Sequence, residues 1–146
     1  METRRLEKSE WEKAKVFFAD VFTKAPWFDD WSDEDQLDAY INDLTQNPNS
    51  LAFAMFDGEE MVALSMGLIK HWFRGTEYCI EELCVTTARQ GQGIGTRFVS
   101  DIERLISGMG LKAIFLQTDR DMPAFEFYKK RGFCLLEDHV SFAKDI

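Results

Sequence analysis

The sequence predicts a single mixed α/β domain of the α+β kind, in which helices flank one mixed but mostly antiparallel sheet. A length of 146 residues suits one domain. Residues 9–22 and 32–44 carry apolar side chains at helical spacing, and a meander of three strands follows over residues 51–85. Helical and strand patterns then alternate, which favours helices packed around a central sheet.

The first half of the chain contains clear start signals. Residues 4–8, RRLEK, are expected to form a short first strand. Ser9, with Glu12 three residues later, predicts a capping box at the first helix. Ser32 and the acidic run Asp33–Asp35 suit the N-terminus of the second helix.

The second half is punctuated by turns. Asp57-Gly58 predicts a hairpin turn inside the meander. A helix over residues 93–107 precedes a strand over residues 111–118. A short helix begins near Pro123, and residues 133–143, FCLLEDHVSFA, are expected to form the last strand.

Composition and charge exclude several classes of protein. A net charge of −9 argues against general affinity for nucleic acid, and no apolar run is long enough for a membrane span. We expect no signal peptide, because the N-terminal stretch lacks an apolar core. The scattered Cys79, Cys84 and Cys134 argue against disulfides and zinc and favour a cytoplasmic setting. His71 and His139 lack partners at metal or triad spacing, so no metal site is expected.

A glycine-rich segment, ARQGQGIGTRF at residues 88–98, separates a strand from a helix. Gly91, Gly93 and Gly95 precede a helix whose first N–H groups have no partner within the helix. Glycines let a phosphate approach the backbone closely, so this segment is typical of an anion site. The alternative is a tight turn that needs positive φ, and three glycines before a helix favour the anion site.

The glycine spacing distinguishes between phosphate-binding motifs. No lysine follows as a P-loop requires, and the third glycine of a GxGxxG pattern would fall on Thr96 or Phe98. The order Gln90-x-x-Gly93-x-Gly95 instead resembles the Gln/Arg-x-x-Gly-x-Gly/Ala signature of the GNAT superfamily of N-acetyltransferases.

A second segment, PAFEFYKKRGF at residues 123–133, strengthens this resemblance. It is similar to the superfamily's A-x-x-x-Y-x-x-x-G-F segment. Residues 50–144 resemble the acetyl-CoA-binding core, and residues 1–49 match only as the expected variable helices on the acceptor side. The matching residues of the segment are Ala124, Tyr128, Gly132 and Phe133.

The resemblance implies that acetyl-CoA is the cofactor and that an amine receives its acetyl group. One strand would offer backbone groups to the pantetheine arm, and a backbone N–H there would stabilise the developing oxyanion. The amides of the glycine-rich segment would wrap the pyrophosphate. The cofactor-binding residues that the resemblance implies are Leu83, Cys84, Val85, Gln90, Gly91, Gln92, Gly93, Ile94, Gly95, Thr96 and Asp121.

Asp121 and Tyr128 are the two remaining positions near the expected cofactor. Many superfamily members carry Asn at the place of Asp121, and a carboxylate cannot donate a hydrogen bond as an amide does. Tyr128 is the candidate acid for the leaving thiolate. Its alternative role is packing beside Phe125 and Phe127, but the motif favours the catalytic role.

Glu81 and Glu82 interrupt an otherwise apolar strand. Consecutive strand residues point to opposite faces, so one of the two should face the cofactor side. The pair resembles the acidic pair of spermidine/spermine N-acetyltransferases, which implies Glu81 as general base and Glu82 as the residue that binds the amine. The alternative is a solvated or Arg-paired carboxylate.

The segment APWFDDWSDED at residues 25–35 is the candidate acceptor wall. Trp27 and Trp31 stand among acidic residues, and together they could hold a cation by carboxylates and ring faces. Buried aromatics below an acidic helix start are an equal alternative. A similar P-W-x-x-x-W loop occurs in some aminoglycoside-acetylating relatives.

These observations favour an N-acetyltransferase that transfers acetyl directly to a primary amine of a small cationic metabolite, such as a polyamine or an aminoglycoside. A protein lysine or N-terminal acceptor is an alternative, and so is a non-catalytic acyl-CoA sensor on the same fold. No nucleic-acid or membrane partner is expected. The last strand and the Phe-rich end of the sequence could support a homodimer.

Overall fold

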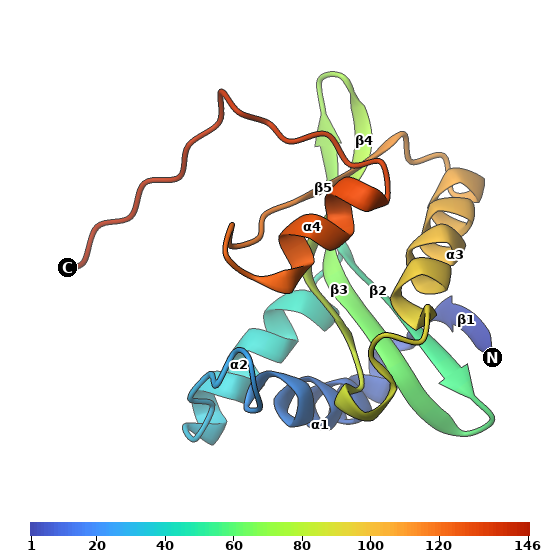
Figure 1. Cartoon of the computed structure of the whole chain (residues 1–146), viewed down its shortest axis with the longest axis vertical. Coiled ribbons are helices and arrows are strands. Elements are labelled where there is room, and N and C mark those ends of the chain that lie inside the picture. Colours follow the sequence, from blue (N-terminus) through green and yellow to red (C-terminus); the bar gives the residue numbers. More distant parts are fainter.

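The apolar run at residues 51–56 lies inside the sheet. In the computed structural model, which describes all 146 residues, β2 (Ser50–Asp57) is buried at every position except Asp57. Helices cover both faces of the sheet (Figure 1). The strand therefore needs apolar side chains on both sides, which explains why it does not alternate between polar and apolar residues.

Five strands form the sheet in the order β1-β2-β3-β4-β5. Every neighbouring pair is antiparallel except β4 and β5, which are parallel, so the predicted mixed but mostly antiparallel sheet is confirmed. No helix combines the length and the apolar character that a bilayer crossing needs. The other elements are β1 (Glu2–Arg5), α1 (Trp11–Phe22), α2 (Glu34–Thr45), β3 (Glu60–Trp72), β4 (Gly75–Val85), α3 (Ile94–Gly108), β5 (Ala113–Leu116) and α4 (Pro123–Lys130).

Two apolar cores lie on opposite faces of the sheet. Phe56 belongs to the core under α1 and α2, together with Phe18 and Ile41. Phe53 belongs to the core under α3, together with Phe98. Each fully buried side chain of this size contributes about 1.5–3 kcal/mol. The alternation within β2 thus attaches the two helical layers to one strand.

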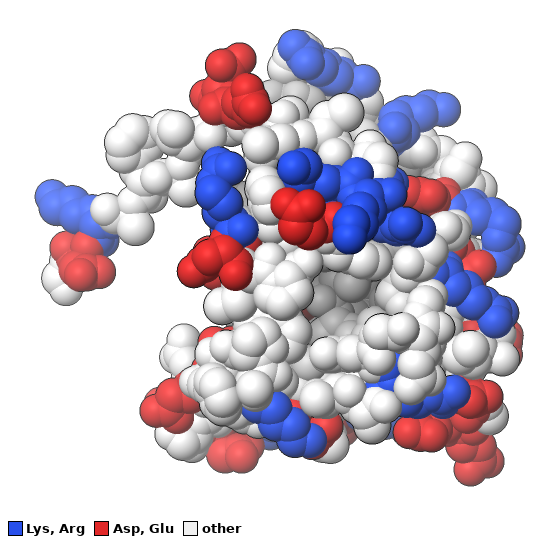
Figure 2. Space-filling model, viewed as in Figure 1, with Lys and Arg blue, Asp and Glu red and all other residues white.

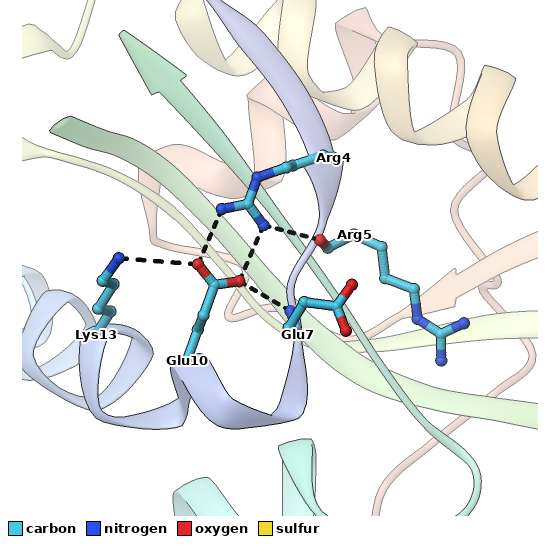
Figure 3. A network of polar contacts seen from close by, with 5 residues as sticks. All are labelled: Arg4, Arg5, Glu7, Glu10 and Lys13. Carbon is cyan, nitrogen blue, oxygen red and sulfur yellow. Dashed lines mark hydrogen bonds and ion pairs between the residues drawn. The ribbon is translucent and has the colours of Figure 1, made fainter. Parts of the chain in front are cut away.

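An ion pair joins β1 to the start of α1. The Arg4 guanidinium donates to both Glu10 carboxylate oxygens at 2.8 and 2.9 Å, and Glu10 also accepts from the Glu7 N–H at 2.9 Å (Figure 3). The Arg4 hydrogen bonds lower the pKa of Glu10 to about 2. The predicted capping box of Ser9 and Glu12 is therefore wrong, because the chain makes a 3₁₀ turn at Lys8–Glu10 and α1 starts after it.

Two other predictions about element boundaries are confirmed, and one is wrong. Asp33 caps α2 by accepting from the Gln36 N–H at 3.0 Å, as its position predicted. The hairpin between β2 and β3 turns at Gly58, whose φ is +62°. The predicted last strand over residues 133–143 is wrong: these residues form no strand, and the segment after α4 extends away from the body (Figure 1).

A β-bulge sits where β3 and β4 come closest. Met66 faces Glu82 and Gly67 faces Ile80, so Glu81 has no partner on β3. A Cβ added at Gly67 would lie 2.0 Å from the carbonyl oxygen of Cys79, so only glycine fits. The bulge turns the following part of β4 and thereby positions both glutamates.

β4 and β5 separate after a short ladder. Their pairing runs from Glu77 with Ala113 to Ile80 with Leu116. Residues 81–85 of β4 continue without a strand on that side. The separation leaves one backbone edge of β4 open below α4 (Figure 1).

We predict that Gly67→Ala destabilises the protein by at least about 2 kcal/mol, since the added methyl group must displace backbone atoms. Urea unfolding followed by circular dichroism measures the change. Gly108→Ala is the matched control, because no atom lies within 4 Å of its added Cβ. It should be neutral or slightly stabilising. Equal stability of the two variants would contradict the close contact at Gly67.

Candidate active site

A cavity of about 1170 Å³ opens where β4 leaves β5. Its walls come from β4, β5, α4, the segment after α4 and the loop that follows α1. Figure 2 shows the surface hollowed between the region of α4 and that of α1. The side chains that carry chemistry in its wall include Trp27, Asp29, Glu81, Glu82, Tyr128 and Lys129.

Glu82 is held by a tyrosine from another element. The Tyr40 hydroxyl of α2 donates to Glu82 Oε1 at 2.5 Å. Burial raises the pKa of Glu82 to about 7, an effect that the Tyr40 hydrogen bond partly offsets and that the nearby Asp29 and Glu81 strengthen. Glu82 is half-buried, whereas Glu81 is exposed, so the Glu82 carboxyl is the one of the two whose pKa burial brings close to neutral pH.

An aromatic stack supports Tyr40 from behind. The Trp31 ring lies 5.2 Å from the Tyr40 ring at an interplanar angle of 12°, and it packs edge-on against Phe18. Burial and the Glu82 contact raise the pKa of Tyr40, so its hydroxyl keeps the proton that it donates. Trp31 does not line the cavity, whereas Trp27 does and packs against Phe22.

Tyr128 reaches the same cavity from α4. Its ring packs against Phe127 and Phe133 at centroid distances of 5.3 and 5.2 Å. Burial raises the pKa of its phenol, so the group stays protonated at neutral pH. Tyr128 therefore both packs against its aromatic neighbours and lines the cavity.

The glycine-rich segment presents a row of free amides. The N–H groups of residues 91–96 find no acceptor in the chain, and the first helical bond there runs from the Arg97 N–H to the Gly93 carbonyl. Gly91 and Gly93 have φ of +75° and +79°, with open space where a Cβ would be. The Gln90 side chain donates to the Val85 carbonyl at 3.1 Å and ties the segment to the end of β4. Free amides with room around them suit the pyrophosphate of coenzyme A.

The segment also contacts α4. A Cβ at Gly95 would lie 3.4 Å from the Phe127 ring and 3.6 Å from Val85, so Gly95 permits close packing between α3, α4 and β4. The expected cofactor residues on β4 differ in where their side chains lie. Leu83 lines the cavity, whereas the Cys84 side chain is buried in the core. Asp121 is exposed and does not line the cavity.

Charge is unevenly distributed around the cavity. Asp29, Glu81 and Glu82 lie on one side. Lys129 and Arg131 lie on the other, at the end of α4, where Figure 2 shows a gathering of basic side chains. The acidic side suits a cationic ligand, and the basic side suits an anionic one.

Sequence reasoning missed two members of the site. The helical spacing of residues 32–44 does not distinguish Tyr40 from the apolar residues around it, and Asp29 is one acid among several in residues 25–35. The spacing within a helix cannot reveal a contact between residues 42 positions apart, which is the separation of Tyr40 and Glu82. The one indication in the sequence is that Tyr40 lies among apolar residues of its helix. A buried tyrosine hydroxyl requires a hydrogen-bond partner, so a polar group from another element is expected near it.

We predict that Glu82→Gln stabilises the protein at pH 8 but not at pH 4.5. The folded pKa of about 7 exceeds the ordinary 4.5, so the contribution of Glu82 to stability is fully present below about pH 4.5 and is lost as pH rises through 7. Between pH 4.5 and pH 8, the difference in the free energy of unfolding between Glu82→Gln and wild type should grow by up to about 3 kcal/mol.

Urea unfolding at the two pH values measures this difference. Glu81→Gln is the matched control, because it removes a charge from the exposed neighbour and should change little between the two pH values. A constant difference between Glu82→Gln and wild type at both pH values would refute the assigned environment of Glu82.

Comparison with known proteins agrees with this arrangement. A model of the acetyltransferase (GNAT) family matches residues 10–133. A search of curated protein sequences found no significant match.

Solved structures share the fold at low sequence identity. The aminoglycoside acetyltransferase meta-AAC0020 from an uncultured soil metagenomic sample, in complex with sisomicin, superposes with a TM-score of 0.76 at 20% identity, over 99% of this chain and 95% of that one. AAC(6')-Iy in complex with a bisubstrate analogue superposes with a TM-score of 0.75 at 14% identity, over 99% of this chain and 98% of that one. A possible acetyltransferase from Clostridium difficile 630 superposes with a TM-score of 0.82 at 14% identity, over 99% of this chain and 97% of that one.

The family match spans most of the chain and includes both the glycine-rich segment and Tyr128. Members of this family use acetyl-CoA. The predicted resemblance is therefore confirmed: this chain belongs to the GNAT family of acetyltransferases and is an acyltransferase.

Proposed function

We propose that this protein transfers the acetyl group of acetyl-CoA to a primary amine of a small cationic metabolite. The observation that carries the proposal is the acidic side of the cavity, where Glu82 lies with Asp29 and Glu81 and shares the cavity with Tyr128. An alkyl ammonium ion is attracted there and must lose a proton before its nitrogen can attack.

The cofactor would be held by backbone groups. The free amides of residues 91–96 fit its pyrophosphate, and the open edge of β4 at Leu83–Val85 fits the amide groups of its pantetheine arm. Lys129 and Arg131 fit a further phosphate group on the basic side. Bound acetyl-CoA supplies an acetyl group activated as a thioester.

We assign the base to Glu82 rather than to Glu81, which reverses the roles that the resemblance to spermidine/spermine N-acetyltransferases implied. A base works best when its pKa is close to the working pH, and burial brings the pKa of Glu82 to about 7. Tyr40 fixes the carboxylate in one orientation. Glu81 is exposed on the bulge and, with Asp29 and Trp27, attracts and contacts the ammonium ion.

Tyr128 is the proposed acid. A tyrosine phenol carries its proton at neutral pH, burial raises the pKa of Tyr128 further, and the ring packing against Phe127 and Phe133 fixes its direction. The proton on its oxygen is available to a leaving sulfur anion. Proton transfer by a positioned group is typically worth about 10²–10⁴ in rate.

The charge of the site and the structural neighbours support the proposed acceptor class. Structural neighbours include aminoglycoside acetyltransferases, and polyamines and aminoglycosides both carry several ammonium groups. An acceptor of this kind places one amine at Glu82 while Asp29 and Glu81 hold others. A protein lysine is the alternative acceptor, and a non-catalytic acyl-CoA sensor is the alternative of a different class.

We predict that the protein acetylates polyamines or aminoglycosides when a library of amines is incubated with acetyl-CoA and analysed by mass spectrometry. The rate should rise with pH through an apparent pKa near 7, since Glu82 must be ionised to accept a proton. In Glu82→Gln the rate should fall at least about tenfold at pH 7 and recover partly at high pH.

The control is Glu81→Gln, which should raise the Michaelis constant and keep the pH profile. Failure to acetylate any amine in the library, with intact binding of acetyl-CoA, would favour the sensor. A Glu82→Gln profile identical to wild type would remove Glu82 as the base.

We predict that Gly93→Val lowers the affinity for coenzyme A at least about tenfold. Valine disfavours the positive φ of +79°, so the amides of the segment must move, and its side chain occupies the space beside them. Calorimetric titration measures the affinity. Gly110→Val is a matched control with a similar φ of +84° at the far end of α3. Equal affinities of both variants would contradict the assigned phosphate site.

A further inference from the structure

Phe28, in the loop between α1 and α2, is the one residue other than glycine with a positive φ. Its φ of +50° lies in the left-handed region, which glycine and asparagine adopt far more readily than a bulky side chain. Hydrogen bonds to the end of α1 hold this turn on both sides. The Phe28 N–H donates to the Lys24 carbonyl at 3.0 Å. The Asp29 N–H donates to the Phe22 carbonyl at 2.9 Å. The backbone at this position therefore disfavours phenylalanine.

The packing of the fold does not require the Phe28 ring either. The side chain is 71% exposed, and it does not belong to the core under α1 and α2. Trp27 and Trp31, in the same loop, do pack against that core. An exposed ring on a strained backbone contributes little to folding. Strained positions of this kind are concentrated where proteins contact ligands, so the ring indicates contact with another molecule.

Phe28 lies at the rim of the active-site cavity. Its two neighbours in the chain, Trp27 and Asp29, line the cavity, whereas Phe28 does not. The turn thus directs the neighbouring side chains inward and leaves the Phe28 ring outside, next to the acidic side of the cavity. A molecule that is bound in the cavity and extends outward past Asp29 meets this ring.

We propose that Phe28 is a specificity-determining residue, which contacts the part of the acceptor that projects from the cavity while one amine lies at Glu82. This inference rests on the proposed function. The ring face attracts a second ammonium group, and the ring also covers the hydrocarbon that joins the two groups. The acceptor class that it selects is therefore an extended polycation with hydrocarbon between its ammonium groups. A short amine stays inside the cavity and does not reach the ring.

The ring supplies a contact that the acids beside it cannot. Asp29 and Asp30 follow Phe28 and attract any cation, whereas a ring discriminates by the hydrocarbon that the cation carries. The ring face is also open to a ligand, because no lysine or arginine of the chain lies over it. Phe73, which is similarly exposed at 78%, has the Arg74 guanidinium 5.4 Å from its ring centre.

Calorimetric titration in the presence of coenzyme A tests the contact with two related amines. Spermine is the extended polycation, and trimethylenediamine matches only its end. Phe28→Asn removes the ring and suits the left-handed backbone, so it should weaken spermine binding at least about threefold and leave trimethylenediamine binding unchanged. Phe28→Tyr keeps the ring and should bind both amines as wild type does. Phe73→Asn, which removes an exposed ring that does not line the cavity, should also behave as wild type.

The outcomes separate this inference from the proposed function. Equal spermine affinities of Phe28→Asn and wild type, in a protein that acetylates amines, overturn the role of Phe28 and leave the proposed function intact. Absence of spermine binding to wild type overturns the acceptor class that is assigned to the ring. Absence of both binding and acetylation for every amine overturns the proposed function as well.

Urea unfolding separates contact with the acceptor from a role in the fold. Phe28→Asn should be at least as stable as wild type, because asparagine adopts the left-handed conformation more readily and the exposed ring loses no core packing. A clear loss of stability, or an equal loss of affinity for spermine and trimethylenediamine, would assign the ring to the fold and overturn the proposal.

Discussion

The contact between Gly67 and the carbonyl of Cys79 is the constraint on which the site depends. Because the two backbones meet so closely, the ladder between β3 and β4 shifts by one residue and leaves Glu81 without a partner. The shift occurs just where β4 leaves β5. One close backbone contact therefore sets the direction of both glutamates and the edge that would hold the cofactor.

The electrostatic character of the site comes from elements far apart in the sequence. Glu82 lies on β4, Tyr40 on α2 and Asp29 in the loop between α1 and α2. Burial raises the pKa of Glu82, the charges of the nearby Asp29 and Glu81 raise it further, and the Tyr40 hydrogen bond partly offsets this effect. The result is a carboxyl group with a pKa near neutral pH, which is the property that the proposed base needs to take a proton from an ammonium group.

Elements with strong local signals were predictable. The hairpin at Gly58, the helix after the glycine-rich segment and the Asp33 cap depend on turn residues and periodicity, which act over a few positions. The start of α1 could not be predicted from local signals. Arg4 of β1 binds the Glu10 carboxylate, and this contact, rather than a cap at Ser9, fixes where the helix begins. Residues 133–143 have strand-like composition, but a strand forms only where a partner edge is within reach.

The sequence by itself determined the family, the mixed sheet and the glycine-rich segment, since these depend on residue spacing along a single stretch of chain. It also indicated Glu81, Glu82 and Tyr128 as candidate site residues, and all three line one cavity in the structure. Only the tertiary structure decided which glutamate is half-buried and that Tyr40 donates to it. Burial and pKa depend on the distances between elements, and local spacing carries no information about those distances.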